Sequence, residues 1–217
     1  MLYIVATPIG NLKDITFRAV ETLNAVDLIA CEDTRHSKIL LEHYGIKTPT
    51  TSFFAHNRLV KGEYLSGLLK DGKNIAVISD AGMPGILDPG YNLINLAIKN
   101  NIPVTVIPGP AAFINALVAS GKPAHEFIFA GFLPNRSGAR KNKLRQLSQS
   151  GCTIIAYESC HRIIASLKDI AEVFPGQEVV VARELTKKFE EILRGAPGLI
   201  IEKLQNNSPK GEFVVIV

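Results

Sequence analysis

The twelve residues SDAGMPGILDPG, at positions 79–90, decide how the first half of the chain folds. The apolar run at residues 75–78 comes directly before them and predicts a buried strand. The apolar spacing of residues 91–100, directly after them, predicts a helix. The stretch is therefore a long loop at the carboxyl end of a strand, which is where open α/β sheets bind ligands.

Three glycines and two prolines in this loop leave backbone amides and carbonyls exposed, because glycine admits close approach and proline fixes the chain direction. Such a wall suits a flat, polar ligand such as a nucleoside. Asp80 or Asp88 would then accept hydrogen bonds from a ribose or an amine. A long structural turn with solvated aspartates explains the same composition equally well, so both interpretations stay open here.

The length of 217 residues suffices for one large or two modest domains, and 47% hydrophobic residues is typical of a folded protein. Met1 leads straight into the strand-like residues 2–6, which predicts that no signal peptide is present. The most apolar region, residues 102–119, is interrupted by three prolines and is too short to span a membrane. We therefore expect a soluble protein.

The three cysteines, Cys31, Cys152 and Cys160, are widely spaced and form no CxxC pair. This pattern predicts neither a disulfide framework nor a zinc site, and a reducing cytoplasm fits it best. The carboxylates are scattered over different loops without metal-ligand spacing, so we expect no metal.

Basic residues are concentrated in one short segment, although the net charge of +4 is modest. Within ten residues and without an intervening acid lie Arg136, Arg140, Lys141, Lys143 and Arg145. This segment predicts a phosphate-binding patch, and a solvated basic helix face is an equally good interpretation before other evidence.

Strand and helix patterns alternate along the whole chain, which predicts α/β domains with largely parallel sheets covered by helices. A break at residues 121–124 divides the chain into predicted domains 1–121 and 122–217, with a cleft between them. The predicted strands are 2–6, 27–31, 50–54, 75–78, 104–107, 127–130, 153–157, 178–182, 189–193 and 213–217. The first predicted helix follows Thr16. The other predicted helices cover 37–44, 59–69, 91–100, 112–119, the basic segment, 163–174 and 199–204.

Polar residues are concentrated beside the ends of these strands, and in a parallel sheet such ends converge on one edge. They are Asn11, Asp14, Glu32, Asp33, Arg35, Asp80, Glu158, Arg162, Arg183, Glu184, Lys187, Lys210 and Glu212. Residues 7–11, TPIGN, match neither the dinucleotide fingerprint nor the P-loop, which argues against a nicotinamide or ATP site. His161 is a candidate base beside Glu158, although a lone histidine at a helix start is more often a cap or a surface residue.

Nine motifs occur in a fixed order along the chain. They are ATPIGNL (6–12), EDTR (32–35), SDAGMP (79–84), DPG (88–90), PGPAA (108–112), GFLP (131–134), YES (157–159), RELTK (183–187) and KGEF (210–213). With these motifs the sequence closely resembles, from end to end, the bacterial ribosomal RNA small subunit methyltransferase I family of the tetrapyrrole methylase superfamily.

This resemblance implies two α/β domains of the tetrapyrrole methylase type, with S-adenosylmethionine (SAM) in the interdomain cleft. It implies a homodimer that methylates a cytidine ribose 2′-hydroxyl in the decoding region of small-subunit (16S) ribosomal RNA, in the assembled 30S subunit. The implied cofactor contacts are Asp80, Gly82, Met83, Ile86, Ala111, Ala112 and Tyr157. Residues 7–11, including Asn11, would face the substrate.

The sequence departs from the family pattern at three positions and in its length. The family usually has threonine at Met83, serine at Ala111 and proline at Cys160. We therefore expect backbone contacts, not side-chain hydrogen bonds, at the first two. A further small C-terminal domain is expected beyond Val217, so we also expect the RNA affinity of this chain to be reduced.

Methyl transfer from a sulfonium is an in-line displacement, so positioning supplies much of the rate. A ribose hydroxyl also needs a proton acceptor or a stabiliser of its developing charge. The hypothesis is that Glu184 or Glu158 accepts the proton. Charge stabilisation or phosphate binding would fall to Lys187, Arg35 or Lys210, and the cations of the basic segment, Arg136, Arg140, Lys141 and Lys143, would bind RNA phosphates.

Two rival interpretations remain open at this point. One is a SAM-dependent methylase of a tetrapyrrole or of a protein side chain. The other is a non-catalytic ribosome-binding factor that has kept the fold. The basic segment and EDTR favour the RNA methyltransferase over the first rival.

Overall fold

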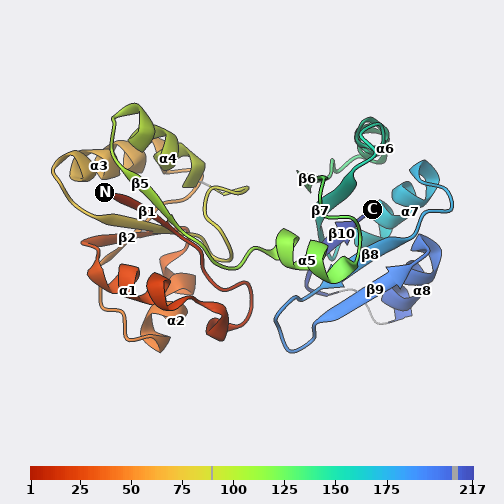
Figure 1. The fold of residues 1–217 in the computed structure, drawn as a ribbon, viewed down its shortest axis with the longest axis horizontal. Coiled ribbons are helices and arrows are strands. Elements are labelled where there is room, and N and C mark those ends of the chain that lie inside the picture. The colour runs from red at the N-terminus through yellow and green to blue at the C-terminus, as the bar shows by residue number, and fades with distance from the viewer. Residues whose placement is uncertain (89, 207–209) are drawn as a thin grey trace. The chain divides into compact units, whose positions relative to one another are not determined.

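The computed structural model describes residues 1–88, 90–206 and 210–217 and divides into two compact units, Met1–Ala111 and Ala112–Val217 (Figure 1). Pro89, part of the DPG motif in the predicted ligand loop, lies outside the described residues. No described helix combines the length and the apolar character that crossing a membrane requires.

The first unit is built on a fully parallel five-stranded sheet in the order β3-β2-β4-β1-β5, which confirms the predicted sheet type. Its strands are β1 (Leu2–Val5), β2 (Leu28–Cys31), β3 (Thr50–Ser52), β4 (Ile75–Ile78) and β5 (Val104–Ile107). Its helices are η1 (Leu12–Asp14), α1 (Phe17–Ala25), α2 (Thr34–His43), α3 (Arg58–Lys70) and α4 (Gly90–Lys99).

Helices cover both faces of this sheet, as Figure 1 shows. On β4, Ile75 and Val77 pack with α3 and α4, whereas Ala76 and Ile78 pack with α1 and α2. Successive side chains of a strand point to opposite faces, so a strand covered on both sides is apolar throughout. Because the strands are parallel, the polar loops that follow β1, β2, β4 and β5 all lie at one edge of the sheet.

The second unit is built on a mixed five-stranded sheet in the order β6-β7-β10-β8-β9. Its strands are β6 (Phe127–Phe132), β7 (Thr153–Ser159), β8 (Val179–Arg183), β9 (Glu191–Gly195) and β10 (Glu212–Ile216). Its helices are α5 (Ala112–Ser120), α6 (Ser137–Ser148), α7 (Ile163–Val173) and α8 (Pro197–Asn206). Only β6 and β7 are parallel, so the expectation of a largely parallel sheet is wrong for this unit.

The predicted convergence of polar residues survives this difference, because β10 runs antiparallel between β7 and β8. Glu212, at the start of β10, pairs with Ser159 at the end of β7. Phe213 pairs with Arg183 at the end of β8. The start of β10 therefore lies at the same edge as the ends of β7 and β8.

Helix α5 belongs to the second unit, so the boundary lies at Ala111 and Ala112 and differs from the one expected after residue 121. The buried Ala116 and Leu117 of α5 pack with side chains of β7, β8 and β10. Gly121, with φ of +74°, ends this helix rather than the domain. Helices α6, α7 and α8 contribute to the core on the other face of the sheet.

Candidate functional site

In the first unit, the loop after β1 is joined to the loop after β4. The Thr7 amide donates to the Gly82 carbonyl at 2.9 Å, and the Gly82 amide donates to the Thr7 carbonyl at 3.0 Å. The Thr7 hydroxyl also donates to the Ser79 carbonyl at 3.0 Å. Gly82 has φ of +82°, a conformation that glycine adopts without strain. These contacts fix the predicted ligand loop at its start.

Asp88 holds the same loop at its other end. Its Oδ1 accepts hydrogen bonds from the Gly85 amide at 2.6 Å and from the Gly90 amide at 2.9 Å. Burial raises the pKa of Asp88 more than these two hydrogen bonds lower it. Asp88 is thus engaged by its own loop, which leaves Asp80 as the better ligand acceptor of the two aspartates.

Asp80 links the ends of β2 and β4. Its Oδ1 accepts a hydrogen bond from the Asp33 amide at 3.1 Å, and its own amide donates to Glu32 Oε2 at 3.4 Å. Burial raises the pKa of Glu32, and the charge of Asp80 adds to this effect. The EDTR motif and the predicted ligand loop therefore form one polar edge. Among the residues that the structure describes, no group of three or more His, Cys, Asp and Glu is placed to hold a metal ion.

Arg35 lies at the start of α2, where Asp33 caps the helix. Asp33 Oδ1 accepts a hydrogen bond from the Arg35 amide at 2.8 Å, and Asp33 Oδ2 pairs with the guanidinium at 2.9 Å. Hydrogen bonds from the Arg35 side chain and amide lower the pKa of Asp33 to about 2. The Arg35 side chain is 91% exposed, so it is accessible to a phosphate despite this pair.

The remaining predicted cofactor residues of the first unit lie along the same edge. Gly109 passes so close to β1 that an added Cβ would lie 2.8 Å from the Ala6 Cβ. Ile86 and Ala111 are half-buried. Met83 is half-buried, with its side chain packed against the core shared with α3 and α4. Asn11 is exposed, and its side chain caps η1 by accepting from the Lys13 amide.

In the second unit, two carboxylates hold the Lys187 ammonium. Nζ donates to Glu184 Oε1 at 2.9 Å and to Glu212 Oε2 at 2.9 Å. Glu184 Oε1 also accepts from the Glu212 amide at 3.0 Å. We call these three residues the Lys187 cluster.

The backbone around the Lys187 cluster is strained. Glu184 has φ of +50° and Thr186 has φ of +65°, both unusual for residues other than glycine. Gly211 lies so close that an added Cβ would be 2.5 Å from Glu184 Oε1. The buried Thr186 hydroxyl has no hydrogen-bond partner within the described ranges. Such strain is concentrated at functional sites, where it persists because surrounding contacts fix it.

The contacts within the Lys187 cluster hold Glu184 and Lys187 in their ionised states. Burial by itself would raise the pKa of Glu184, but the hydrogen bonds from Lys187 and from the Glu212 amide outweigh it and lower that pKa. Burial by itself would lower the pKa of Lys187, but the hydrogen bonds to Glu184 and Glu212 outweigh it and raise that pKa. The site therefore presents a fixed ammonium at neutral pH.

Glu158, the other predicted base, is buried in a structural network. Its Oε1 accepts from Arg162 at 2.9 Å and from the Ser166 hydroxyl at 2.6 Å. Its Oε2 accepts from the Ser159 amide at 3.0 Å. Both oxygens are occupied and the side chain is 0% exposed, so proton transfer to Glu158 would require breaking this network.

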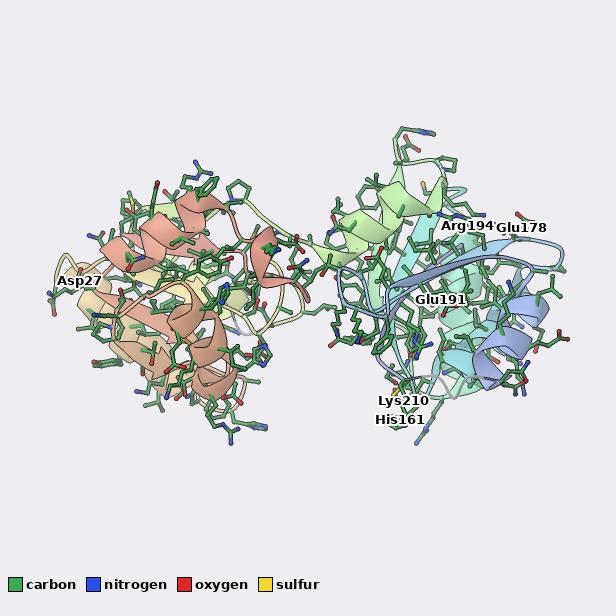
Figure 2. All side chains as sticks on the ribbon, turned by 90° about the horizontal axis from the view of Figure 1, so that it is seen from below. Asp27, His161, Glu178, Glu191, Arg194 and Lys210 are labelled. Atoms are coloured by element: carbon green, nitrogen blue, oxygen red, sulfur yellow. The ribbon has the colours of Figure 1, made fainter. Side chains whose placement is uncertain are left out.

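His161 and Lys210 are exposed at one end of the second sheet. Glu178 and Arg194 lie at the other end (Figure 2). The Lys210 carbonyl accepts from Arg183 Nε at 2.8 Å, which fixes its backbone and leaves its ammonium exposed. The structure thus brings Lys210 to the edge that carries the Lys187 cluster and leaves His161 on the surface.

Tyr157 lies in an aromatic group that the sequence analysis missed. Its ring centroid is 5.0 Å from that of Phe129 and 5.8 Å from that of Phe132, and Phe113 stacks on Phe129 at 4.4 Å. Burial raises the pKa of Tyr157. The three phenylalanines within residues 127–132 were the signal for this group. The predicted contact Ala112 packs against the same core.

The basic segment is not uniform, and the prediction that Arg140 binds RNA phosphates is wrong. Arg140 is 3% exposed and pairs with Asp169 at 2.6 Å. Lys141 pairs with Glu172 at 3.0 Å. Arg136, Lys143 and Arg145 are exposed. Arg140, Leu144 and Leu147 are the buried residues of α6, and their spacing of four and three places Arg140 on the apolar face.

The charge of the chain is distributed unequally between the two units. The first unit contains ten basic and ten acidic residues, so its net charge is zero. The second unit contains fourteen basic and ten acidic residues and therefore carries the whole net charge of +4. An anionic partner is attracted to the second unit on this ground.

Comparison with known proteins gives one consistent family. A family profile described as tetrapyrrole (corrin/porphyrin) methylases matches residues 1–198. Curated relatives named ribosomal RNA small subunit methyltransferase I include one from Synechocystis sp., 49% identical over 219 residues, covering 100% of this chain and 78% of the relative. The relative from Mycoplasmopsis pulmonis is 51% identical, covering 99% of this chain and 96% of the relative.

Solved structures with low sequence identity share the fold. A cobalt precorrin-4 methyltransferase superposes with a TM-score of 0.74 at 17% identity, covering 99% of this chain and 93% of that chain. A diphthine synthase superposes with a TM-score of 0.76 at 12% identity, covering 100% and 89%. A uroporphyrin-III C-methyltransferase from Thermus thermophilus, solved with S-adenosyl homocysteine, superposes with a TM-score of 0.64 at 15% identity, covering 99% and 96%.

Proposed function

Because the chain belongs to the ribosomal RNA small subunit methyltransferase I family of the tetrapyrrole methylases, we propose that it methylates small-subunit ribosomal RNA with SAM. The proposed acceptor is the ribose 2′-hydroxyl of a cytidine in the decoding region of the assembled 30S subunit. The observation that carries this proposal is the 49% identity to a curated relative across the whole chain. The charge of the second unit supports an RNA substrate.

The edge of the first unit fits a nucleoside-containing cofactor. Gly82 and Gly109 bring the backbone close to a ligand, and the half-buried Asp80 has the chemistry to accept hydrogen bonds from ribose hydroxyls. We propose that this edge binds SAM through Asp80, Gly82, Met83, Ile86 and Ala111. Ala112 and Tyr157 of the second unit are proposed as further contacts. When bound, SAM supplies the sulfonium methyl group.

The Lys187 cluster has the chemistry that methylation of a hydroxyl requires. We propose that the Lys187 ammonium stabilises the negative charge that develops on the 2′-oxygen, since fixed charges act strongly in a preorganised site. The hydroxyl proton leaves as the new carbon–oxygen bond forms and the bond from the methyl carbon to the sulfonium sulfur breaks, so a nearby carboxylate must accept it. Glu184 Oε2 is the proposed acceptor, and Glu158 is assigned the structural role of holding Arg162.

The exposed cations are proposed to hold RNA phosphates around this site. Arg136 and Lys143 on the α6 side and Lys210 beside the Lys187 cluster are exposed in the second unit. Lys141, whose side chain pairs with Glu172, would have to exchange that partner for a phosphate. Arg35 and Asn11 are proposed substrate contacts of the first unit. Ribosomal subunits as substrate imply a cytoplasmic location.

A homodimer is also part of the proposal. Exposed apolar side chains support it, among them Val118 on α5, which is 74% exposed. Sedimentation of the purified protein at several concentrations tests it, and a monomer at every concentration would contradict it.

The proposed function is tested by transfer of a labelled methyl group from SAM to small subunits that lack the modification. Free ribosomal RNA and a porphyrinogen mixture are assayed alongside. The expected result is label in the subunit RNA, at one ribose that alkali no longer cleaves. Label in the porphyrinogen alone would replace the substrate by a tetrapyrrole. Subunit binding without any transfer would indicate a non-catalytic factor.

A further inference from the structure

Phe132 is an exposed aromatic side chain in a place where the sheet would ordinarily bury it. It is the last residue of β6 and is 57% exposed, whereas the next residue, Leu133, is 2% exposed. An exposed phenylalanine on a long, mobile loop needs no explanation. Phe132 lies instead at the end of a paired strand, so its exposure is built into the fold.

A bulge in β6 turns the Phe132 side chain to the face of the sheet that carries Tyr157. Phe129 pairs with Ile155 and Phe132 pairs with Tyr157, so β6 uses three steps where β7 uses two. The extra residue is accommodated by Gly131, whose φ is +64°. In regular pairing Gly131 would face Tyr157, and Phe132 would point to the opposite face, toward the core of α6 and α7. The bulge places Phe132 beside Tyr157 instead.

Two arginines, the half-buried Arg162 and the buried Arg140, fix the loop that follows Phe132. Arg162, paired with Glu158, donates to the Leu133 carbonyl and to Asn135 Oδ1. Arg140, paired with Asp169, donates to the Pro134 and Asn135 carbonyls, both at 3.1 Å. Phe132 therefore cannot retreat into the core when no partner is bound, and its ring is presented at little entropic cost.

The surroundings of Phe132 favour a nucleobase as its partner. Its ring makes a T-shaped contact with the ring of Tyr157, with the centroids 5.8 Å apart, and 57% of the residue stays exposed to solvent. The exposed Arg136 follows four residues later, in the unit that carries all of the net positive charge. Fixed aromatic rings beside cations are how proteins bind unpaired RNA bases without reading their hydrogen-bonding edges.

We propose that Phe132 is a stacking platform for an unpaired base of the RNA, next to the ribose that is methylated. The inference rests on the proposed function and adds a specific RNA contact to it. Phe132 holds the RNA strand in position and takes no part in the chemistry, so its removal weakens RNA binding. Tyr157, the proposed SAM contact beside it, keeps its packing on Phe129, so SAM binding is expected to persist.

The test compares Phe132→Ala, Phe132→Leu and Phe132→Trp with the wild type. Phe17→Leu is a matched control, because Phe17 is 90% exposed on α1 of the first unit. Dissociation constants are measured for unmethylated small subunits and, by calorimetry, for SAM. Stacking on one aromatic ring is worth about 1–3 kcal/mol per base, which corresponds to roughly a fivefold to 150-fold loss of subunit affinity for Phe132→Ala.

We expect that loss for Phe132→Ala and Phe132→Leu, near-wild-type affinity for Phe132→Trp, and SAM binding unchanged in all three. A Phe132→Ala variant that loses SAM affinity instead would make Phe132 part of the cofactor site and overturn the inference, as would unchanged affinity for both ligands. A wild-type protein that transfers no methyl group to subunits would defeat the proposed function. A fully active wild type with an unaffected Phe132→Ala variant would defeat only this inference.

Discussion

Lys187 is the side chain on which the proposed chemistry depends most. Replacing it by Met keeps its approximate length but removes the charge that Glu184 and Glu212 hold in place. We expect the single-turnover rate of methyl transfer to fall about 10²–10³-fold, the usual effect of removing one preorganised electrostatic group. SAM affinity should change little. Glu184→Gln keeps the shape of its partner and should lower the same rate less, and full transfer by that variant would remove Glu184 as the proton acceptor.

The pKa shifts of Glu184 and Lys187 define a pH range in which both groups keep their charges. Glu184 has a pKa below its ordinary 4.5, so its stabilising contribution is present above that pH and is lost as pH falls through the lowered value. Lys187 has a pKa above its ordinary 10.5, so its contribution is lost only as pH rises through the raised value. We therefore expect the single-turnover rate to be flat between about pH 6 and 9. A midpoint near neutrality would identify a different acceptor.

At the scale of elements, two cations of α6 that look equivalent in the sequence differ in burial: Arg140 is buried and Lys143 is exposed. Arg140→Ala leaves the buried Asp169 without its charged partner, with the Ser137 hydroxyl still donating to it, and breaking such a pair costs about 3–5 kcal/mol of unfolding free energy. Lys143→Ala removes an exposed charge and should change stability by less than about 0.5 kcal/mol. Urea unfolding measures both. Equal stability of the two variants would contradict the burial of Arg140.

The elements themselves were predictable because burial on both faces of a sheet makes strands continuously apolar, as in residues 75–78 of β4. The pairing of the strands was not predictable, because nothing in the local sequence shows that Glu212 pairs with Ser159. For the same reason the domain boundary was expected after residue 121, whereas α5 packs with the sheet of the second unit. The candidate site was likewise predictable in its local motifs and not in its long-range contacts. Motif order indicated the family and the cofactor loop, whereas only the three-dimensional contacts distinguish the occupied oxygens of Glu158 from the Lys187 cluster.

At the scale of the whole molecule, the unequal charge of the two units predicts where salt sensitivity arises. Binding to small subunits should weaken as salt rises, because phosphate contacts release counterions. Neutralising the exposed Lys143 to Gln should reduce the slope of log affinity against log salt by roughly one, as for one phosphate contact. Lys99→Gln, at an exposed position in the neutral first unit, is the control and should leave the slope unchanged.

The position of β10 in the second sheet has a consequence for synthesis of the protein. The first sheet is complete once residue 107 has been made, whereas β7 and β8 are joined only by residues 212–216. On a translating ribosome both strands keep open edges until that late segment emerges, and open edges invite aggregation or chaperone binding. Nascent chains arrested before residue 212 should resist protease in residues 1–111 and be cleaved beyond them. Equal protection of both parts would show that the second unit folds without its central strand.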